Sequence, residues 1–109
     1  MDIDAIKQRI MEGNYEFSIH AQQERLEDDL DITEIETAIM GGEVIENYPD
    51  DPRGESCLVL GYVGPIPVHL VMGWAYGQSN GEKTLRIITV YIPQAPKWED
   101  PRRRGGKTS

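Results

Sequence analysis

Residues 85–93 read Leu-Arg-Ile-Ile-Thr-Val-Tyr-Ile-Pro, and this stretch decides the fold. β-Branched and aromatic residues dominate it, and Pro93 ends it because proline has no backbone N–H to donate to a neighbouring strand. We therefore predict a central strand. Successive side chains of a strand point to opposite faces. The two predicted faces carry Arg86, Ile88, Val90 and Ile92 on one side, and Leu85, Ile87, Thr89 and Tyr91 on the other.

Other stretches around this strand also have the composition of strands, and Pro, Gly, Asn and Asp separate them. Such residues favour turns, and Asn80-Gly81 is typical of a two-residue hairpin loop. The pattern therefore predicts a short strand followed by an antiparallel meander. The predicted strands are residues 44–48, 56–63, 68–75 and 84–92, and the predicted turns are residues 49–54, 64–67 and 76–83.

Two helices are predicted before residue 30. Apolar residues recur at roughly helical spacing after Asp2 and Asp4, either of which can cap a helix, until Gly13-Asn14 ends the pattern. Residues 15–17 then alternate between apolar and polar side chains, which indicates extended chain. Ser18 is the predicted cap of a second helix, which runs through Leu26 and ends near Asp28-Asp29.

A third helix is predicted from Thr33 and Glu36, whose spacing fits a capping box. Gly41-Gly42 ends it. Its apolar stripe consists of Ile32, Ile35, Ala38 and Ile39.

Helices followed by a meander indicate an α+β fold. We predict two to three N-terminal helices packed on one face of a mainly antiparallel sheet of about four strands, with the other face partly open. A chain of 109 residues suffices for one hydrophobic core. We expect a single domain over residues 1–100 and a basic, disordered tail over residues 101–109.

Charge is distributed unevenly along the chain. Residues 1–56 hold 16 acidic and 4 basic side chains, whereas residues 57–109 hold 3 acidic and 7 basic ones, within a net charge of −8. A polyanion would be attracted only by the net positive charge of the second half. The acidic first half suits a basic protein partner. No run of apolar residues approaches a membrane span and no secretory signal is visible, so we expect a cytoplasmic protein. The single cysteine, Cys57, has no partner for an internal disulfide.

Several motifs together resemble one family. Over residues 15–100, in order, the chain is similar to the domain of unknown function 4258 family. In many relatives an arginine stands four residues after the histidine, whereas Glu24 holds that place here and Arg25 follows. The motifs that carry the resemblance are Ser18-x-His20-Ala21, residues 32–36, residues 42–51, residues 56–61, Pro67-Val68-His69, residues 87–93 and Lys97-Trp98-x-Asp100.

This resemblance implies a function. Such proteins look like distant relatives of the RelE, BrnT and MqsR-like toxins, whose compact helix-plus-sheet fold cleaves RNA. They also resemble the toxin halves of pairs that are encoded beside a zinc-finger antitoxin. The resemblance therefore implies a RelE-toxin-like fold, RNA as a substrate and a basic or zinc-finger antitoxin-like protein as a partner. A fold by itself establishes no activity.

Metal-independent RNA cleavage needs a base, an acid and a cation for the phosphate. The chain offers these types, and we expect no cofactor and no metal site, since no His-x-x-x-His spacing occurs. Each candidate also has a structural interpretation, as a helix-start residue, a buried histidine, a sheet aromatic or an ion-pair partner. The predicted catalytic residues are His20, Arg25, His69, Thr89 and Tyr91, and the predicted RNA-binding residues are Arg86, Lys83 and Lys97.

Two other functions fit the same residues. One is a non-catalytic interaction module of the same fold, whose acidic first half docks on a basic partner. The other is a small-ligand binder with an apolar lining around Tyr62, Trp74 and Tyr91. The nuclease hypothesis predicts that the histidines and arginines converge on one concave surface at the open face of the sheet, and the module hypothesis predicts that they are separated.

Overall fold

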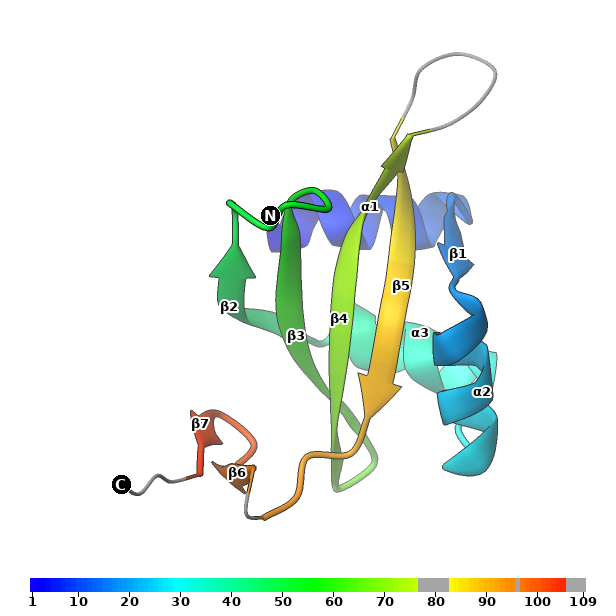
Figure 1. The fold of residues 1–109 in the computed structure, drawn as a ribbon. Helices are drawn as coiled ribbons and strands as arrows, with labels where there is room; N and C mark the ends of the chain where they lie inside the picture. Colours follow the sequence, from blue (N-terminus) through cyan, green and yellow to red (C-terminus); the bar gives the residue numbers. More distant parts are fainter. Residues whose placement is uncertain (77–82, 96, 106–109) are drawn as a thin grey trace.

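The structure is a computed structural model that describes residues 1–76, 83–95 and 97–105. It contains three helices and two sheets within these residues (Figure 1). The helices are α1 (Ile3–Glu12), α2 (Ile19–Glu27) and α3 (Ile32–Met40). The strands are β1 (Tyr15–Phe17), β2 (Glu43–Tyr48), β3 (Ser56–Val63), β4 (Ile66–Tyr76), β5 (Lys83–Tyr91), β6 (Trp98–Asp100) and β7 (Arg103–Arg104).

The main sheet has five strands in the order β1-β5-β4-β3-β2. β1 is parallel to β5 and the other neighbours are antiparallel, so the predicted α+β class and the mainly antiparallel sheet are confirmed. The predicted count of about four strands was too low, because three alternating residues in β1 cannot be told from an extended connection before their partner strand is known. β6 and β7 form a separate two-stranded sheet.

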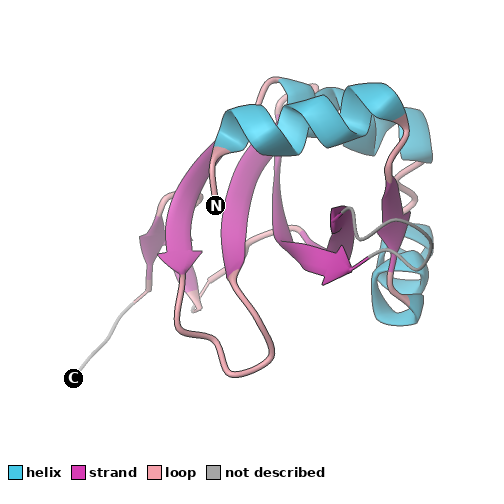
Figure 2. Cartoon of the chain, turned by 90° about the horizontal axis from the view of Figure 1, so that it is seen from above, coloured by secondary structure: helices cyan, strands magenta, loops and turns pink. Residues whose placement is uncertain are grey.

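Two of the helices, α1 and α3, cover one face of the main sheet, as Figures 1 and 2 show. Their isoleucines pack on apolar side chains of β3, β4 and β5 in one buried cluster. α3 approaches β3 closely at Gly61, where a Cβ atom would lie 2.3 Å from the carbonyl oxygen of Ala38. α2 lies beside β1 and β5 at the edge of the sheet (Figure 1). The predicted packing on one face thus holds for α1 and α3, and much of the opposite face is left to the site described below.

The helix ends follow local capping chemistry. The side chains of Asp2 and Ser18 cap α1 and α2, and Gly13 ends α1 with φ 70°, a conformation that suits glycine. These predictions are confirmed.

The predicted cap of α3 was wrong. The capping box consists of Asp31 and Glu34, two residues earlier than predicted. Both pairs have the same spacing, but a start at Asp31 places Leu30 and Ile35 in the core together, as in a hydrophobic staple. Ile32 is 39% exposed and leaves the predicted apolar stripe.

The predicted alternation of β5 was also wrong in its second half. Met72 pairs with Ile87 and Val71 pairs with Thr89, so Ile88 forms a β-bulge. One extra residue moves every later side chain to the opposite face. Val90 therefore joins Leu85 and Ile87 in the core, and Thr89 and Tyr91 turn to the open face of the sheet.

Strand limits elsewhere are close to those predicted. β3 matches residues 56–63, whereas β4 begins at Ile66 because Gly64, at φ 59°, and Pro65 form the whole turn. Arg103–Arg104 pairs with β6, so residues 103–104 form a strand where we expected a disordered tail. The predicted hairpin at Asn80-Gly81 lies outside the described residues. None of the described helices has the length and apolar character to span a bilayer.

Candidate active site

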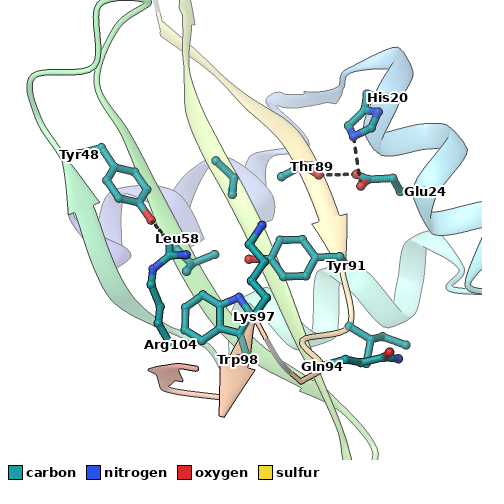
Figure 3. Close-up of a pocket in the computed structure, with 12 residues that line it drawn as sticks. His20, Glu24, Tyr48, Leu58, Thr89, Tyr91, Gln94, Lys97, Trp98 and Arg104 are labelled. Atoms are coloured by element: carbon teal, nitrogen blue, oxygen red, sulfur yellow. Dashed lines mark hydrogen bonds and ion pairs between the residues drawn. The ribbon is translucent and has the colours of Figure 1, made fainter. Parts of the chain in front are cut away.

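A hollow of about 550 Å³ lies on the open face of the sheet. α2 and β5 form one side of it, and Gln94, Lys97, Trp98 and Arg104 form another, so parts of the chain far apart in sequence meet there (Figure 3). The rings of Tyr48 and Trp98 contribute to its wall. Its polar lining comes from His20, Glu24, Thr89, Tyr91, Lys97 and Arg104.

The β-bulge positions α2 over this hollow. Ser18 donates its backbone N–H to the carbonyl of Ile87 at 2.9 Å, and its hydroxyl donates to the carbonyl of Ile88 at 2.7 Å. The same hydroxyl oxygen accepts from the backbone N–H of Ala21 and so caps the helix. One serine thus joins the start of α2 to the bulge, which places the next turns of the helix beside Thr89.

Glu24 is held at three points. One carboxylate oxygen accepts two hydrogen bonds. The Thr89 hydroxyl donates one, and the backbone N–H of Val90 donates the other at 2.8 Å. Its other oxygen lies 3.1 Å from Nε2 of His20, one helical turn earlier. A ring that carries its hydrogen on Nε2, on the side of this carboxylate, leaves Nδ1 able to accept a proton. The His20 side chain is 67% exposed, so its ring is accessible to a substrate.

His69 lies beneath the hollow and is fully buried. Its Nε2 is 2.6 Å from the carbonyl oxygen of Pro101, and its Nδ1 is 3.1 Å from the hydroxyl of Tyr91. A carbonyl only accepts, so Nε2 is the donor and Nδ1 of the neutral ring accepts the Tyr91 hydroxyl. Burial lowers the pKa of His69, which keeps the ring neutral, although the Pro101 carbonyl acts in the opposite direction. His69 thus contacts the site through Tyr91, whereas His20 lines it directly.

Tyr91 and two cations complete the hollow. Burial raises the pKa of Tyr91, although the nearby Trp98 indole and the Arg104 guanidinium oppose that shift. Lys97 Nζ lies 5.7 Å from the centre of the Tyr91 ring. Arg104 bonds both carboxylate oxygens of Glu46, at 2.9 and 3.2 Å, and stacks on Trp98. The Tyr91 phenol therefore keeps its proton, and positive charge gathers on the side of the C-terminal segment.

Arg25, predicted to be catalytic, lies outside the hollow. Consecutive residues of a helix are about 100° apart around its axis, so Arg25 faces away from the hollow that Glu24 lines. Its guanidinium bonds the Gln22 side chain and the carbonyl of Leu30, at 2.5 and 3.1 Å, and stacks on Phe17. These contacts tie the end of α2 to the connection that leads to α3.

Two of the predicted RNA-binding residues also lie elsewhere. Arg86 pairs with Glu16 at 2.6 Å and lines a second hollow of about 290 Å³, and Lys83 lies 6.0 Å from the ring of Trp74. Both precede Thr89 along β5. Because each residue advances a strand by roughly 3.3 Å, Arg86 and Lys83 lie farther along the strand, away from the hollow that Thr89 lines. Of the predicted residues, the structure gathers His20, Thr89, Tyr91 and Lys97 around one hollow.

Sequence reasoning did not select eight of the twelve residues that line the hollow, among them Glu24, Tyr48, Trp98 and Arg104. Glu24 had a signal, since it occupies the place where relatives carry an arginine. Trp98 and Tyr48 read as ordinary aromatic residues. Arg104 belongs to a basic run that we expected to be disordered, and only its contact with Glu46, 58 residues away, reveals its place.

A model of a protein family, described as Domain of unknown function (DUF4258), matches residues 17–92. The chain belongs to the DUF4258 family. The resemblance inferred from the motifs is therefore confirmed. Comparison with curated proteins and with solved structures finds no significant match in either. The residues matched to DUF4258 include His20, Glu24, Thr89 and Tyr91, and the match ends before Lys97, so the hollow joins the DUF4258 region to the segment that follows it.

Metal ligands and thiols contribute little to this DUF4258 site. Across residues 1–76, 83–95 and 97–105, no three histidine, cysteine or carboxylate side chains are grouped to hold a metal ion. Cys57 is fully buried in the core, and burial raises its pKa to about 11, so the thiol stays protonated. The polar side chains that line the hollow carry an imidazole, a carboxylate, hydroxyl groups, an amide and two cations.

Proposed function

We propose that this protein is a toxin-like endoribonuclease that cleaves RNA without a metal ion. The observation that carries the proposal is the His20–Glu24 pair, which lies beside Lys97 and Arg104 around one hollow on the open face of the sheet. A carboxylate that holds a histidine orients the ring and stabilises the imidazolium that forms when the ring takes a proton. His20 is thus well placed to act as a general base.

The reaction we propose is transfer of the phosphate to the neighbouring 2′-hydroxyl. Nδ1 of His20 takes the proton of the 2′-hydroxyl, whose oxygen forms a bond to phosphorus while the bond to the 5′ oxygen breaks. Tyr91 gives its proton to the leaving oxygen, and both side chains then return to their starting states by exchange with water. The products are a 2′,3′-cyclic phosphate and a 5′-hydroxyl end.

The cations support this assignment. Charge on the phosphate oxygens grows in the transition state, and cations fixed nearby stabilise it. Lys97 is exposed at the rim, and Arg104 is held in place by Glu46 and Trp98. Glu46 pairs with Arg104 and Glu24 also lines the hollow, so Lys97 is the lining cation that has no carboxylate partner among the described residues. The proposed relation to RelE, BrnT and MqsR-like toxins rests on the sequence resemblance.

The test is incubation of RNA with the purified protein in the presence of a chelator. We expect the wild type to leave cyclic phosphate ends and His20→Ala to lower the rate by about 100-fold or more, the usual contribution of a general base. Gln23→Ala, on the neighbouring exposed position of α2, is the matched control and should cleave like the wild type. Equal rates for the wild type and His20→Ala, or no cleavage by either, would contradict the proposal.

A non-catalytic interaction module is the second candidate. The observation that favours it is an exposed surface on α2 with two large apolar side chains, Ile19 at 80% and Leu26 at 64% exposure. The exposed acidic residues 27–29 adjoin it, which suits a basic or zinc-finger antitoxin-like partner. In that case RNA would stay intact with the wild type, and Ile19→Ser with Leu26→Ser would weaken partner binding while His20→Ala would not. A toxin with an antitoxin would cleave RNA in a His20-dependent way and would also lose partner binding when Ile19 and Leu26 are replaced by serine.

A further inference from the structure

The indole N–H of Trp98 makes no hydrogen bond of normal geometry, although it lies near enough to the Tyr91 hydroxyl to oppose the rise in the Tyr91 pKa. The Trp98 side chain is 2% exposed, and its Nε1 is the one buried side-chain nitrogen or oxygen atom in the described part of the chain without a hydrogen bond. Buried polar groups in folded proteins are nearly always hydrogen-bonded, because an unsatisfied donor costs free energy. The exception therefore calls for a physical explanation.

The position of the indole is set from both sides. The His69 ring meets it edge to face at 4.3 Å between centroids, and the guanidinium of Arg104 lies 4.7 Å from its centre. β6 carries Trp98 and pairs with β7, which carries Arg104. The ring is thus clamped in one orientation, and Figure 3 shows its nitrogen edge turned toward the side of the hollow that holds Lys97 and the Tyr91 hydroxyl.

The chemistry of this corner selects its ligand. An indole N–H only donates, so the occupant must accept a hydrogen bond. Lys97 forms no ion pair with a carboxylate among the described residues, and its ammonium favours an anion. Tyr91 directs its hydrogen to His69, but the hydroxyl can turn toward a ligand. A donor, a cation and a hydroxyl that face one space match the oxygens of a phosphate group.

We propose that Trp98 Nε1, Lys97 Nζ and the Tyr91 hydroxyl form a subsite that binds one phosphate group of the ligand. The identity of that ligand as a nucleic-acid phosphate rests on the proposed function, but the binding of phosphate does not require cleavage. Trp98 is then a binding residue that donates to a phosphate oxygen, and it comes from the segment beyond residues 17–92.

The experiment follows the indole N–H of Trp98 by NMR in ¹⁵N-labelled protein. Trp74→Phe removes the other indole signal, and inorganic phosphate is titrated against chloride at equal ionic strength. We expect phosphate to move the Trp98 signal downfield to saturation, as a new hydrogen bond does, and chloride to leave it in place. A signal that does not move, or that moves equally with chloride, would overturn the subsite.

Two lysine variants separate a local contact from a general charge effect. Lys97→Gln should raise the Kd for phosphate by about tenfold or more, because it removes the cation beside the indole. Lys7→Gln makes the same change of charge on α1, which covers the opposite face of the sheet, and should leave the Kd unchanged. Equal effects of the two variants would overturn the assignment of Lys97.

This test is independent of the cleavage assay. Phosphate binding at Trp98 in a protein that cuts no RNA would support the subsite and contradict the nuclease. RNA cleavage with an unmoved Trp98 signal would support the nuclease and contradict the subsite. Trp98→Phe keeps an aromatic side chain and removes the donor, and if circular dichroism shows the variant folded, calorimetry should give weaker phosphate binding.

Discussion

The hydroxyl of Tyr91 lies 3.1 Å from Nδ1 of the buried ring of His69, and it donates its hydrogen to that nitrogen. The orientation follows from the opposite side of the ring, where Nε2 donates to the carbonyl of Pro101. This neutral histidine therefore joins β4, β5 and the C-terminal segment, and a second proton on its ring would displace the Tyr91 hydrogen.

We expect the stability of the fold to decrease as pH falls below about 6.5, the ordinary pKa of histidine. Burial lowers the pKa of His69 in the folded state, so the unfolded chain binds the extra proton first and gains stability relative to the native state. The stabilisation is complete above pH 6.5 and is lost as pH falls through the lower folded pKa. Urea unfolding between pH 7.5 and 5 measures it.

Two variants assign this pH dependence. His69→Gln has no titrating ring and should show less loss of stability over this range than the wild type, whatever its stability at pH 7.5. His20→Gln removes the exposed histidine and its pair with Glu24, and the loss of stability assigned to His69 should persist in it. The carboxyl groups of Glu43, Glu46 and Asp51, whose pKa values are lowered, act at more acidic pH. An unchanged dependence in His69→Gln would show that His69 is not responsible.

Glu24→Gln should reduce RNA cleavage while it preserves the fold. The amide oxygen can still accept from Thr89 and Val90, but the negative charge beside His20 is lost, so an imidazolium is no longer stabilised. We expect kcat/KM to fall by about 100-fold, within the range of general-base effects. Glu27→Gln, an exposed acidic position of α2, is the control, and an equal fall in both variants would attribute the effect to overall charge.

The parts of the fold that were predicted correctly depend on neighbours in the sequence. Caps at Asp2 and Ser18 and the left-handed Gly13 are local chemistry, and the apolar run of β3 is visible without its partners. The bulge at Ile88 is different, because it arises from the pairing of β5 with β4 and from the two bonds of Ser18. Local alternation therefore grouped Thr89 and Tyr91 with Leu85 and Ile87, whereas the bulge puts these two pairs on opposite faces.

The candidate site shows the same limit. His20, Thr89, Tyr91 and Lys97 could be chosen by residue type, because acid–base groups, hydroxyls and cations suit phosphate chemistry. Type alone did not separate Arg25 from Glu24, since only the helical rotation relative to β5 decides which of them faces the hollow. The contact between Arg104 and Glu46 joins the C-terminal segment to β2, and no local pattern reports it.

The capping box of α3 gives a direct comparison. Asp31 accepts from the backbone N–H of Glu34 at 2.8 Å, whereas Thr33 lies within the first turn and is exposed. Asp31→Ala should lower the free energy of unfolding by about 1 kcal/mol, the usual cost of a lost cap. Thr33→Ala should change it by less than about 0.5 kcal/mol, as for most surface positions. Urea unfolding measures the free energy of unfolding of both variants. A larger loss in Thr33→Ala than in Asp31→Ala would indicate that the capping box is at Thr33.

Gly61→Ala should destabilise the protein by about 1–3 kcal/mol or more, the cost of forcing an atom into a packed interior. A Cβ at this position would lie 2.3 Å from the carbonyl oxygen of Ala38 and 2.7 Å from its carbonyl carbon, so α3 would have to move away from β3. Gly41→Ala is the matched control, because the nearest atom to its Cβ is 3.8 Å away and its φ is −97°. Thermal and urea unfolding compare the two variants. If Gly61→Ala were as stable as Gly41→Ala, the close approach of α3 to β3 would be wrong.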